Sequence, residues 1–146
     1  MRTHHDTKRY PYTPEQLFDL VADVGSYPEF IPWVKGARIT EHTETRFVAE
    51  LIVRFKGITE TYASEVVLNR PKSVDVALVR GPFNHLENHW RFTPTEDGGC
   101  EIDFKVAFEF KNIVLDTLIG ALFARATEKM IDAFSERAEQ LYGTPK

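Results

Sequence analysis

The pattern of apolar and polar residues predicts a short helix near the start of the chain, behind a polar strand. Residues 2–10 are almost all polar and are a candidate strand. After them, Thr13 can cap a helix, Pro14 suits the first helical position and Gln16 can complete a capping box. The apolar residues that follow recur at helical spacing: Leu17, Leu20, Val21 and Val24. We therefore predict a helix that ends at Gly25.

The next segment, DVGSYPEFIPWVKG from Asp23 to Gly36, combines loop-forming and apolar residues. Its prolines and glycines are typical of a connecting segment, and Pro28 predicts a second short helix through residues 29–31. The same segment carries large apolar side chains: Tyr27, Phe30, Ile31, Trp33 and Val34. Two interpretations are open. The aromatic side chains either plug the core or form a lid or rim over an opening in it.

Between residues 37 and 111 the apolar period changes to two, which predicts antiparallel strands. The alternation is clearest from Cys100 to Lys111, where one face is apolar and the other is mostly charged. Turn-forming residues divide the region, and the gaps have hairpin length, which favours a meander over parallel crossovers. The strands are expected at 37–43, 45–56, 58–69, 72–80, 85–94 and 99–111.

Residues 112–142 predict one long helix, ended by Gly143 and Pro145. Its C-terminal half has a narrow apolar stripe. Its N-terminal half is apolar around most of the circumference, through Ile113, Val114, Leu115, Leu118, Ile119, Leu122 and Phe123. A helix that is apolar on nearly all sides must be covered on more than one side. The sheet can cover only one side, so another group is expected to cover the remainder.

Composition limits the class of protein. A chain of 146 residues is expected to form one domain, 1–146. Its net charge of −4 argues against a DNA partner. The single cysteine allows no internal disulfide and favours a reducing cytoplasm. We expect no secretory signal and no membrane-spanning helix, so any contact with a membrane is expected to be peripheral.

The polar residues of the strands give no catalytic or metal site. His85 and His89 would lie about 13 Å apart on one strand, too far for one metal ion. With Glu87 and Arg91 they are expected to form a solvated face. Glu65, Asp75, Arg54 and Arg80 can each be assigned to the outer face of the sheet, and Cys100 to the core. We therefore predict no catalytic residues and no metal.

The order of elements resembles the α+β helix-grip architecture of START-like domains. In that fold two small helices follow the first strand, and a curved antiparallel sheet of about seven strands wraps around a long C-terminal helix. A narrower likeness is carried by LFDLVADVGSYPEFIPW, FKGITETYASEV, GPFNHLENHWRF and MIDAFSERAEQLYG. These stretches resemble the coenzyme Q-binding branch of the family. That branch also contains the bacterial ribosome-association toxin proteins and lies beside polyketide cyclase-like proteins.

The resemblance implies non-catalytic binding of ubiquinone or a related polyisoprenoid lipid in a hydrophobic cavity, in support of respiratory electron transport. It implies no required cofactor, with ubiquinone as the bound ligand. It also implies a cytoplasmic monomer or weak dimer that contacts the cytoplasmic face of the inner membrane transiently. One alternative is a ribosome-associated protein, a toxin-like inhibitor of subunit association. The other is an aromatase or cyclase, which would need a placed acid or base inside the cavity.

The predicted cavity wall combines the aromatic segment, the start of the last helix and the core faces of the strands. The strand residues, with Leu86 and Phe108 as further candidates for the wall, either line a ligand or simply pack the core. Asn88 shares its face with apolar residues and therefore needs a partner; it either serves a quinone carbonyl or, as we favour, bonds a neighbouring backbone group. The predicted ligand-binding residues are Tyr27, Phe30, Ile31, Trp33, Leu51, Val53, Val66, Val76, Leu78, Asn88, Trp90, Phe92, Phe104, Val106, Leu118, Ile119 and Leu122.

Overall fold

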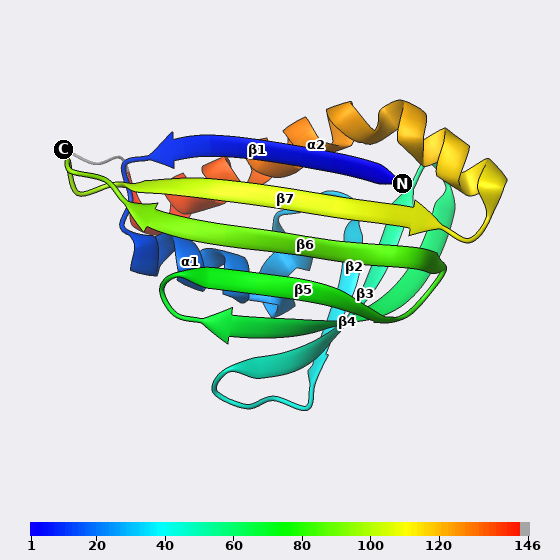
Figure 1. Cartoon of the computed structure of the whole chain (residues 1–146), viewed down its shortest axis with the longest axis horizontal. Helices are drawn as coiled ribbons and strands as arrows, with labels where there is room; N and C mark the ends of the chain where they lie inside the picture. Colours follow the sequence, from blue (N-terminus) through cyan, green and yellow to red (C-terminus); the bar gives the residue numbers. More distant parts are fainter. Residues whose placement is uncertain (144–146) are drawn as a thin grey trace.

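A computed structural model describes residues 1–143 and shows one antiparallel sheet with a long helix along it (Figure 1). The strands and helices are β1 (Arg2–Tyr10), α1 (Pro14–Ala22), the 3₁₀ helix η1 (Val24–Glu29), β2 (Val34–Thr40), β3 (Arg46–Phe55), β4 (Ile58–Asn69), β5 (Ser73–Arg80), β6 (Phe83–Pro94), β7 (Cys100–Phe110) and α2 (Ile113–Tyr142). Pro145, which we expected to help end the last helix, lies outside the described residues.

The sheet is the predicted meander with one addition. Its strand order is β1-β7-β6-β5-β4-β3-β2, and every neighbouring pair is antiparallel. The consecutive strands β2 to β7 are joined as hairpins, and β1 pairs with β7 at the far edge. In Figure 1 the strands β2, β3 and β4 turn behind the plane of β5, β6 and β7. The predicted helix-grip fold is confirmed.

Local sequence signals determine where the helices begin and end. The Thr13 hydroxyl accepts the Gln16 amide at 3.1 Å, and the Thr13 amide donates to the Gln16 side chain at 3.0 Å, which is the predicted capping box. Asn112 caps α2 by accepting the Leu115 amide at 3.1 Å. Gly143 follows the last turn of α2 with a φ of 74°, a conformation that favours glycine.

Some predicted boundaries were wrong. α1 ends at Ala22 rather than Gly25, because Asp23 turns out of the helix and accepts the Ser26 hydroxyl at 2.6 Å. The second small helix is η1, which precedes Phe30 instead of beginning at Pro28. β2 begins at Val34 rather than at residue 37, because Val34 already pairs with Val53 across an irregularity before Gly36.

The close-packed core lies toward one end of the sheet. There α1, the C-terminal half of α2 and the ends of β6 and β7 bury a continuous cluster that includes Phe18, Phe92, Cys100, Phe134 and Ala138. The buried residues of α2 are Leu115, Thr127, Ala133, Phe134 and Ala138. Most of them lie in the second half of the helix, so the first half covers the sheet without filling the space beneath it. No helix within residues 1–143 is long and apolar enough to span a bilayer.

Candidate ligand-binding cavity

A cavity of about 300 Å³ lies between the sheet and the first half of α2. Its wall is formed by β3 to β7, by the segment from η1 to β2 and by α2 from Leu115 to Phe134. Small-molecule sites in proteins usually measure about 300–1,000 Å³ and are mostly apolar. This cavity has the same character, since nearly all of its lining side chains are aliphatic or aromatic.

The structure brings most of the predicted ligand-binding residues together in this one cavity. From the aromatic segment and α2 it places there Tyr27, Ile31, Trp33, Ile119 and Leu122. From the sheet it places there Leu51, Val53, Val66, Val76, Asn88, Trp90, Phe104 and Val106. The two unusual regions of the sequence, the aromatic loop and the start of the last helix, therefore share one hollow.

The other predicted residues, Phe30, Leu78, Phe92 and Leu118, do not line the cavity. Phe92 packs edge-on against Phe18 of α1 at 5.8 Å, because α1 covers that end of the sheet. Leu78 lies beyond the cavity near the end of β5, next to the register irregularity between Ala63 and Ser64. Leu118 faces outward on α2 and is 42% exposed.

Two aromatic residues of the segment 23–36, Phe30 and Trp33, have different surroundings. Phe30 is partly buried and packs against the core: its ring lies 5.3 Å from Phe134, and the Arg137 guanidinium lies 5.2 Å above it. Trp33 instead lines the cavity and contacts Phe55 edge-on at 6.4 Å. Within this segment, Phe30 therefore packs against the core outside the cavity, and Trp33 lines the cavity.

Several cavity residues were not predicted, and the most informative are Tyr62 and Ser64 of β4. Both lie on the face of β4 that also carries Ile58 and Val66. The period-two pattern of residues 58–66 could therefore have placed them inside. From α2, Phe123, Ala126 and other residues also line the wall. Leu86 and Phe108, which were candidates for the wall, do line it. The unpredicted lining residues are Val21, Val24, Val34, Ala49, Phe55, Ile58, Glu60, Tyr62, Ser64, Val74, Phe83, Phe110, Leu115, Phe123, Ala126, Thr127, Met130 and Phe134.

Asn88 has a side-chain partner rather than the backbone partner that we favoured. Its carbonyl oxygen accepts the Trp90 indole N–H at 3.0 Å. An indole nitrogen only donates, so this bond fixes which end of the Asn88 amide faces Trp90. The Asn88 amide nitrogen then points away from Trp90 and makes no hydrogen bond to the described residues.

Tyr62 places a hydroxyl group in the cavity wall in a fixed position. Its ring packs edge-on against Phe83 at 5.4 Å. On its other side lies Gly81, with a φ of 150°, where an added Cβ would come 2.5 Å from the Tyr62 Cβ. Only glycine allows this close approach. Burial raises the pKa of Tyr62 to about 12, so its hydroxyl is protonated at neutral pH.

The remaining polar groups of the wall differ in whether they are already satisfied. The Tyr27 hydroxyl donates to the Val21 carbonyl, and burial raises the pKa of Tyr27 far above its ordinary value. The Thr127 hydroxyl donates to the Phe123 carbonyl at 2.9 Å. By contrast, the Ser64 and Tyr62 hydroxyls line the cavity without a hydrogen bond to any part of residues 1–143.

Charged groups are almost absent from the wall. Glu60, half-buried in β4, is the one charged side chain among the lining residues that the structure describes. The carboxylates and arginines assigned to the outer face do lie there in pairs: Arg46 with Glu65 at 2.7 Å, Arg80 with Glu50 at 2.7 Å and Arg91 with Asp75 at 2.8 Å. Glu60 has no histidine or second carboxylate beside it in the wall, so an acid–base pair is not formed there.

The outer face and Cys100 are as the sequence predicted. His89 Nδ1 lies 2.7 Å from Asp75, and His85 lies 3.5 Å from Glu87, in half-exposed pairs. Burial opposes ionisation of Asp75, but hydrogen bonds from His89 and Arg91 hold its pKa below the ordinary value. Cys100 is fully buried at the start of β7, and burial raises the pKa of its thiol to about 11.

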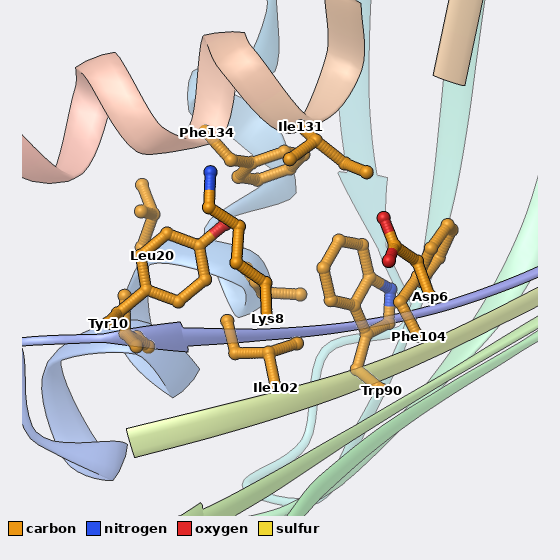
Figure 2. A pocket seen from close by; sticks show the side chains of 11 residues that line it. Asp6, Lys8, Tyr10, Leu20, Trp90, Ile102, Phe104, Ile131 and Phe134 are labelled. Atoms are coloured by element: carbon orange, nitrogen blue, oxygen red, sulfur yellow. The ribbon is translucent and has the colours of Figure 1, made fainter. Parts of the chain in front are cut away.

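A second, much smaller recess of about 30 Å³ lies between β1, α1 and α2 (Figure 2). Figure 2 shows Asp6, Lys8 and Tyr10 of β1 on one side of it and Ile131 and Phe134 of α2 above. Four residues line both this recess and the main cavity and form a partition between the two: Val21, Trp90, Phe104 and Phe134. The recess is too small for a ligand of the size that the main cavity can hold.

Comparisons with known proteins agree with this architecture. A family profile described as "Polyketide cyclase / dehydrase and lipid transport" matches residues 10–135. The ribosome association toxin RatA of Rickettsia prowazekii is 40% identical, over 97% of this chain and 99% of that protein. The mitochondrial coenzyme Q-binding protein COQ10 homolog B of Xenopus laevis is 34% identical over 96% of this chain, which spans 59% of that protein.

The solved structures extend the likeness to the fold. A START superfamily protein from Mycobacterium smegmatis superposes with a TM-score of 0.80 at 20% identity, covering 95% of this chain and 98% of that one. At that identity the comparison shows the fold alone. It agrees with the seven-stranded sheet and long C-terminal helix described above.

Proposed function

Because the chain belongs to the polyketide cyclase / dehydrase and lipid transport family, we propose that it binds ubiquinone or a related polyisoprenoid lipid in the cavity beneath α2, without catalysis. The protein then acts as a carrier that supports quinone use in respiratory electron transport. The observation that supports this proposal most is the cavity itself, an apolar hollow of about 300 Å³. The name of the coenzyme Q-binding relative supports the choice of ligand.

The cavity suits the head and the first part of the tail of such a ligand. Each CH₂ group transferred from water to an apolar wall contributes about 0.8 kcal/mol, so an isoprenoid tail supplies most of the affinity. The volume is at the lower end of the usual range for small-molecule sites. In our proposal a long tail therefore extends out of the cavity.

The outer surface next to the cavity suits contact with a membrane. Ile113 and Val114, in the first turn of α2, are 81% and 76% exposed, and Leu118 one turn later is 42% exposed. An apolar group of this kind on the surface marks an interaction site. In our proposal these residues touch the cytoplasmic face of the inner membrane, where the ligand enters and leaves.

Fluorescence quenching tests the proposal directly, because both tryptophans of the chain, Trp33 and Trp90, line the cavity. Decylubiquinone should quench their emission saturably, and the same quinone ring without a tail should quench much less at equal concentration. Native mass spectrometry of the freshly purified protein should show an isoprenoid quinone. Linear, unsaturable quenching together with ligand-free protein would contradict the proposal.

Ribosome association is a second candidate function, and the name of the Rickettsia prowazekii relative favours it. The surface gives it less support, since several arginines are paired with carboxylates and the net charge is −4. Contact with ribosomal RNA requires a continuous basic face. Co-sedimentation with large ribosomal subunits at physiological salt would support this function, and it can be measured with and without decylubiquinone.

A further inference from the structure

We propose that Tyr62, Ser64 and Asn88 form a polar subsite that holds the oxygen atoms of an uncharged ligand head, and that the cavity rejects anionic heads. This inference rests on the proposed function, because it names the part of the ligand that the same cavity recognises. It distinguishes neutral carbonyl compounds, such as quinones and esters, from fatty-acid carboxylates and lipid phosphates.

The three polar groups of the subsite have unused hydrogen-bonding capacity. The Tyr62 and Ser64 hydroxyls and the Asn88 amide nitrogen line the cavity, and none of them bonds to residues 1–143. A polar group that leaves water without a partner costs about 1–3 kcal/mol. A ligand oxygen would remove that cost, whereas a purely hydrocarbon ligand would not.

The surroundings of Tyr62, Asn88 and Ser64 restrict the movement of each donor. Phe83 packs edge-on against the Tyr62 ring, and Gly81 lies against the Cβ of Tyr62. The bond from the Trp90 indole directs the Asn88 carbonyl toward Trp90 and leaves its amide hydrogens for another acceptor. Ser64 is on a buried stretch of β4 and is only 3% exposed. Donors fixed in this way bind an acceptor without losing much side-chain freedom.

The three donors come from two strands of the sheet, β4 and β6. Tyr62 and Ser64 share one face of β4, while Asn88 is on β6, opposite Val76 of β5. Across the sheet, β4 and β6 are two strand spacings apart, which is about 10 Å between backbones. Along the strands, Asn88 is level with Val66, so it is offset by about 7 Å from Ser64 and about 13 Å from Tyr62. Side chains from both strands reach inward over that gap. A ring with oxygen atoms on opposite edges, as in a benzoquinone, can therefore meet donors on both sides.

The cavity wall offers no positive charge to an anionic head among the described residues. No lysine, arginine or histidine is among the described lining residues, and Glu60 is the one charged group. A carboxylate or phosphate head would enter without a counter-ion and with a like charge in the wall. An unpaired ion in an apolar site is strongly disfavoured. A neutral carbonyl carries no such penalty.

Thermal shift with a pair of matched lipids tests the selectivity. Methyl oleate and oleate share a tail and differ in the charge of the head. A ligand that binds the folded state raises the melting temperature. Methyl oleate should raise it, and oleate at ten times the concentration should not. Equal shifts with the two lipids would overturn the proposal.

Variants test the subsite itself. Tyr62→Phe and Ser64→Ala should each weaken decylubiquinone binding about threefold to tenfold, the loss expected for one neutral hydrogen bond. Binding of squalene, which has no oxygen, should not change. Tyr12→Phe is the matched control, since the Tyr12 hydroxyl donates to the Gly143 carbonyl at 2.9 Å outside the cavity. Unchanged decylubiquinone affinity in both subsite variants would overturn the proposal.

The two proposals can fail separately. If the wild-type protein binds methyl oleate but no quinone, the proposed function fails. The head-group selectivity is then judged by the two oleyl lipids and by the effect of Tyr62→Phe on methyl oleate binding, which should weaken by the same threefold to tenfold. If decylubiquinone binds and oleate binds equally well, the function stands and the selectivity is refuted.

Discussion

The two halves of α2 use apolar residues for different purposes. In the second half, Phe134 and Ala138 are buried, and Phe134 packs against Tyr27, Phe30 and Trp90 at ring distances of 5.3–5.4 Å. In the first half, Ile119, Leu122 and Phe123 face an open cavity. One helix is therefore anchored by packing at one end and covers a hollow at the other. Stability and ligand binding are separated along its length.

The largest contrast should come from removing a ring at each end of the helix. Phe134→Ala should lower the free energy of unfolding by about 3–5 kcal/mol, since it removes a buried ring that packs against three other aromatic rings. Phe123→Ala should cost much less, because Phe123 is half-buried and already faces empty space. Urea denaturation measures both losses. Equal losses in the two variants would contradict the contrast.

Adding bulk should give the reverse result for the two alanines. Ala138 is 0% exposed, so Ala138→Leu should overpack the core and cost about 1–3 kcal/mol. Ala126 lines the cavity, so Ala126→Leu should be tolerated while it reduces the space available to decylubiquinone. Urea denaturation measures the stability of both variants, and the quenching titration measures their binding of decylubiquinone. A stable Ala138→Leu protein, or an Ala126→Leu protein with full quinone binding, would break the comparison.

The hollow region should also have a distinct response to alkaline pH. Because burial raises the pKa of Tyr62 to about 12, the folded protein keeps this proton in a range where the unfolded chain, with a pKa near 10, loses it. Stability therefore decreases as the pH rises from about 10 to about 12. Tyr62→Phe should reduce that decrease, as measured by urea midpoints at about pH 9 and about pH 11. A slope that is the same in the variant would show that Tyr62 is not shielded.

The smallest effect on stability is expected at the outer surface of the first half. Ile113→Ser and Val114→Ser should change the free energy of unfolding by no more than about 0.5 kcal/mol, because both side chains are exposed. The double variant should nevertheless bind less to vesicles of phosphatidylethanolamine and phosphatidylglycerol in a sedimentation assay. Leu141→Ser, at an exposed apolar site near the other end of α2, is the control. Unchanged vesicle binding would place the membrane contact elsewhere.

Most of the fold could be predicted from residue patterns, because local signals determine it. Alternation located β3 to β7 to within a few residues, and the apolar pattern with the glycine at Gly143 located α2. The family resemblance carried by the aromatic segment is confirmed by the profile match. Boundaries around η1 were missed, since they depend on tertiary contacts of the loop.

The cavity residues could be predicted only in part. Alternation tells which face of a strand a residue occupies, but not which part of that face α1 covers. Phe92 was therefore assigned to the wall although it packs under α1. Leu118 was assigned to the cavity wall because the first half of α2 is apolar around most of its circumference. Such a pattern does not show which of its residues face the sheet. Tyr62 and Ser64 were missed because polar side chains do not suggest an inner face.

Hydrogen exchange with and without decylubiquinone tests the central claim most directly. We expect the ligand to slow amide exchange in residues 113–127 of α2 and in the strands of the cavity wall, with little change in residues 135–142, which do not line the cavity. Exchange that is unaffected by the quinone, or that slows equally along the whole of α2, would contradict the division of the helix into an anchored half and a ligand-covering half.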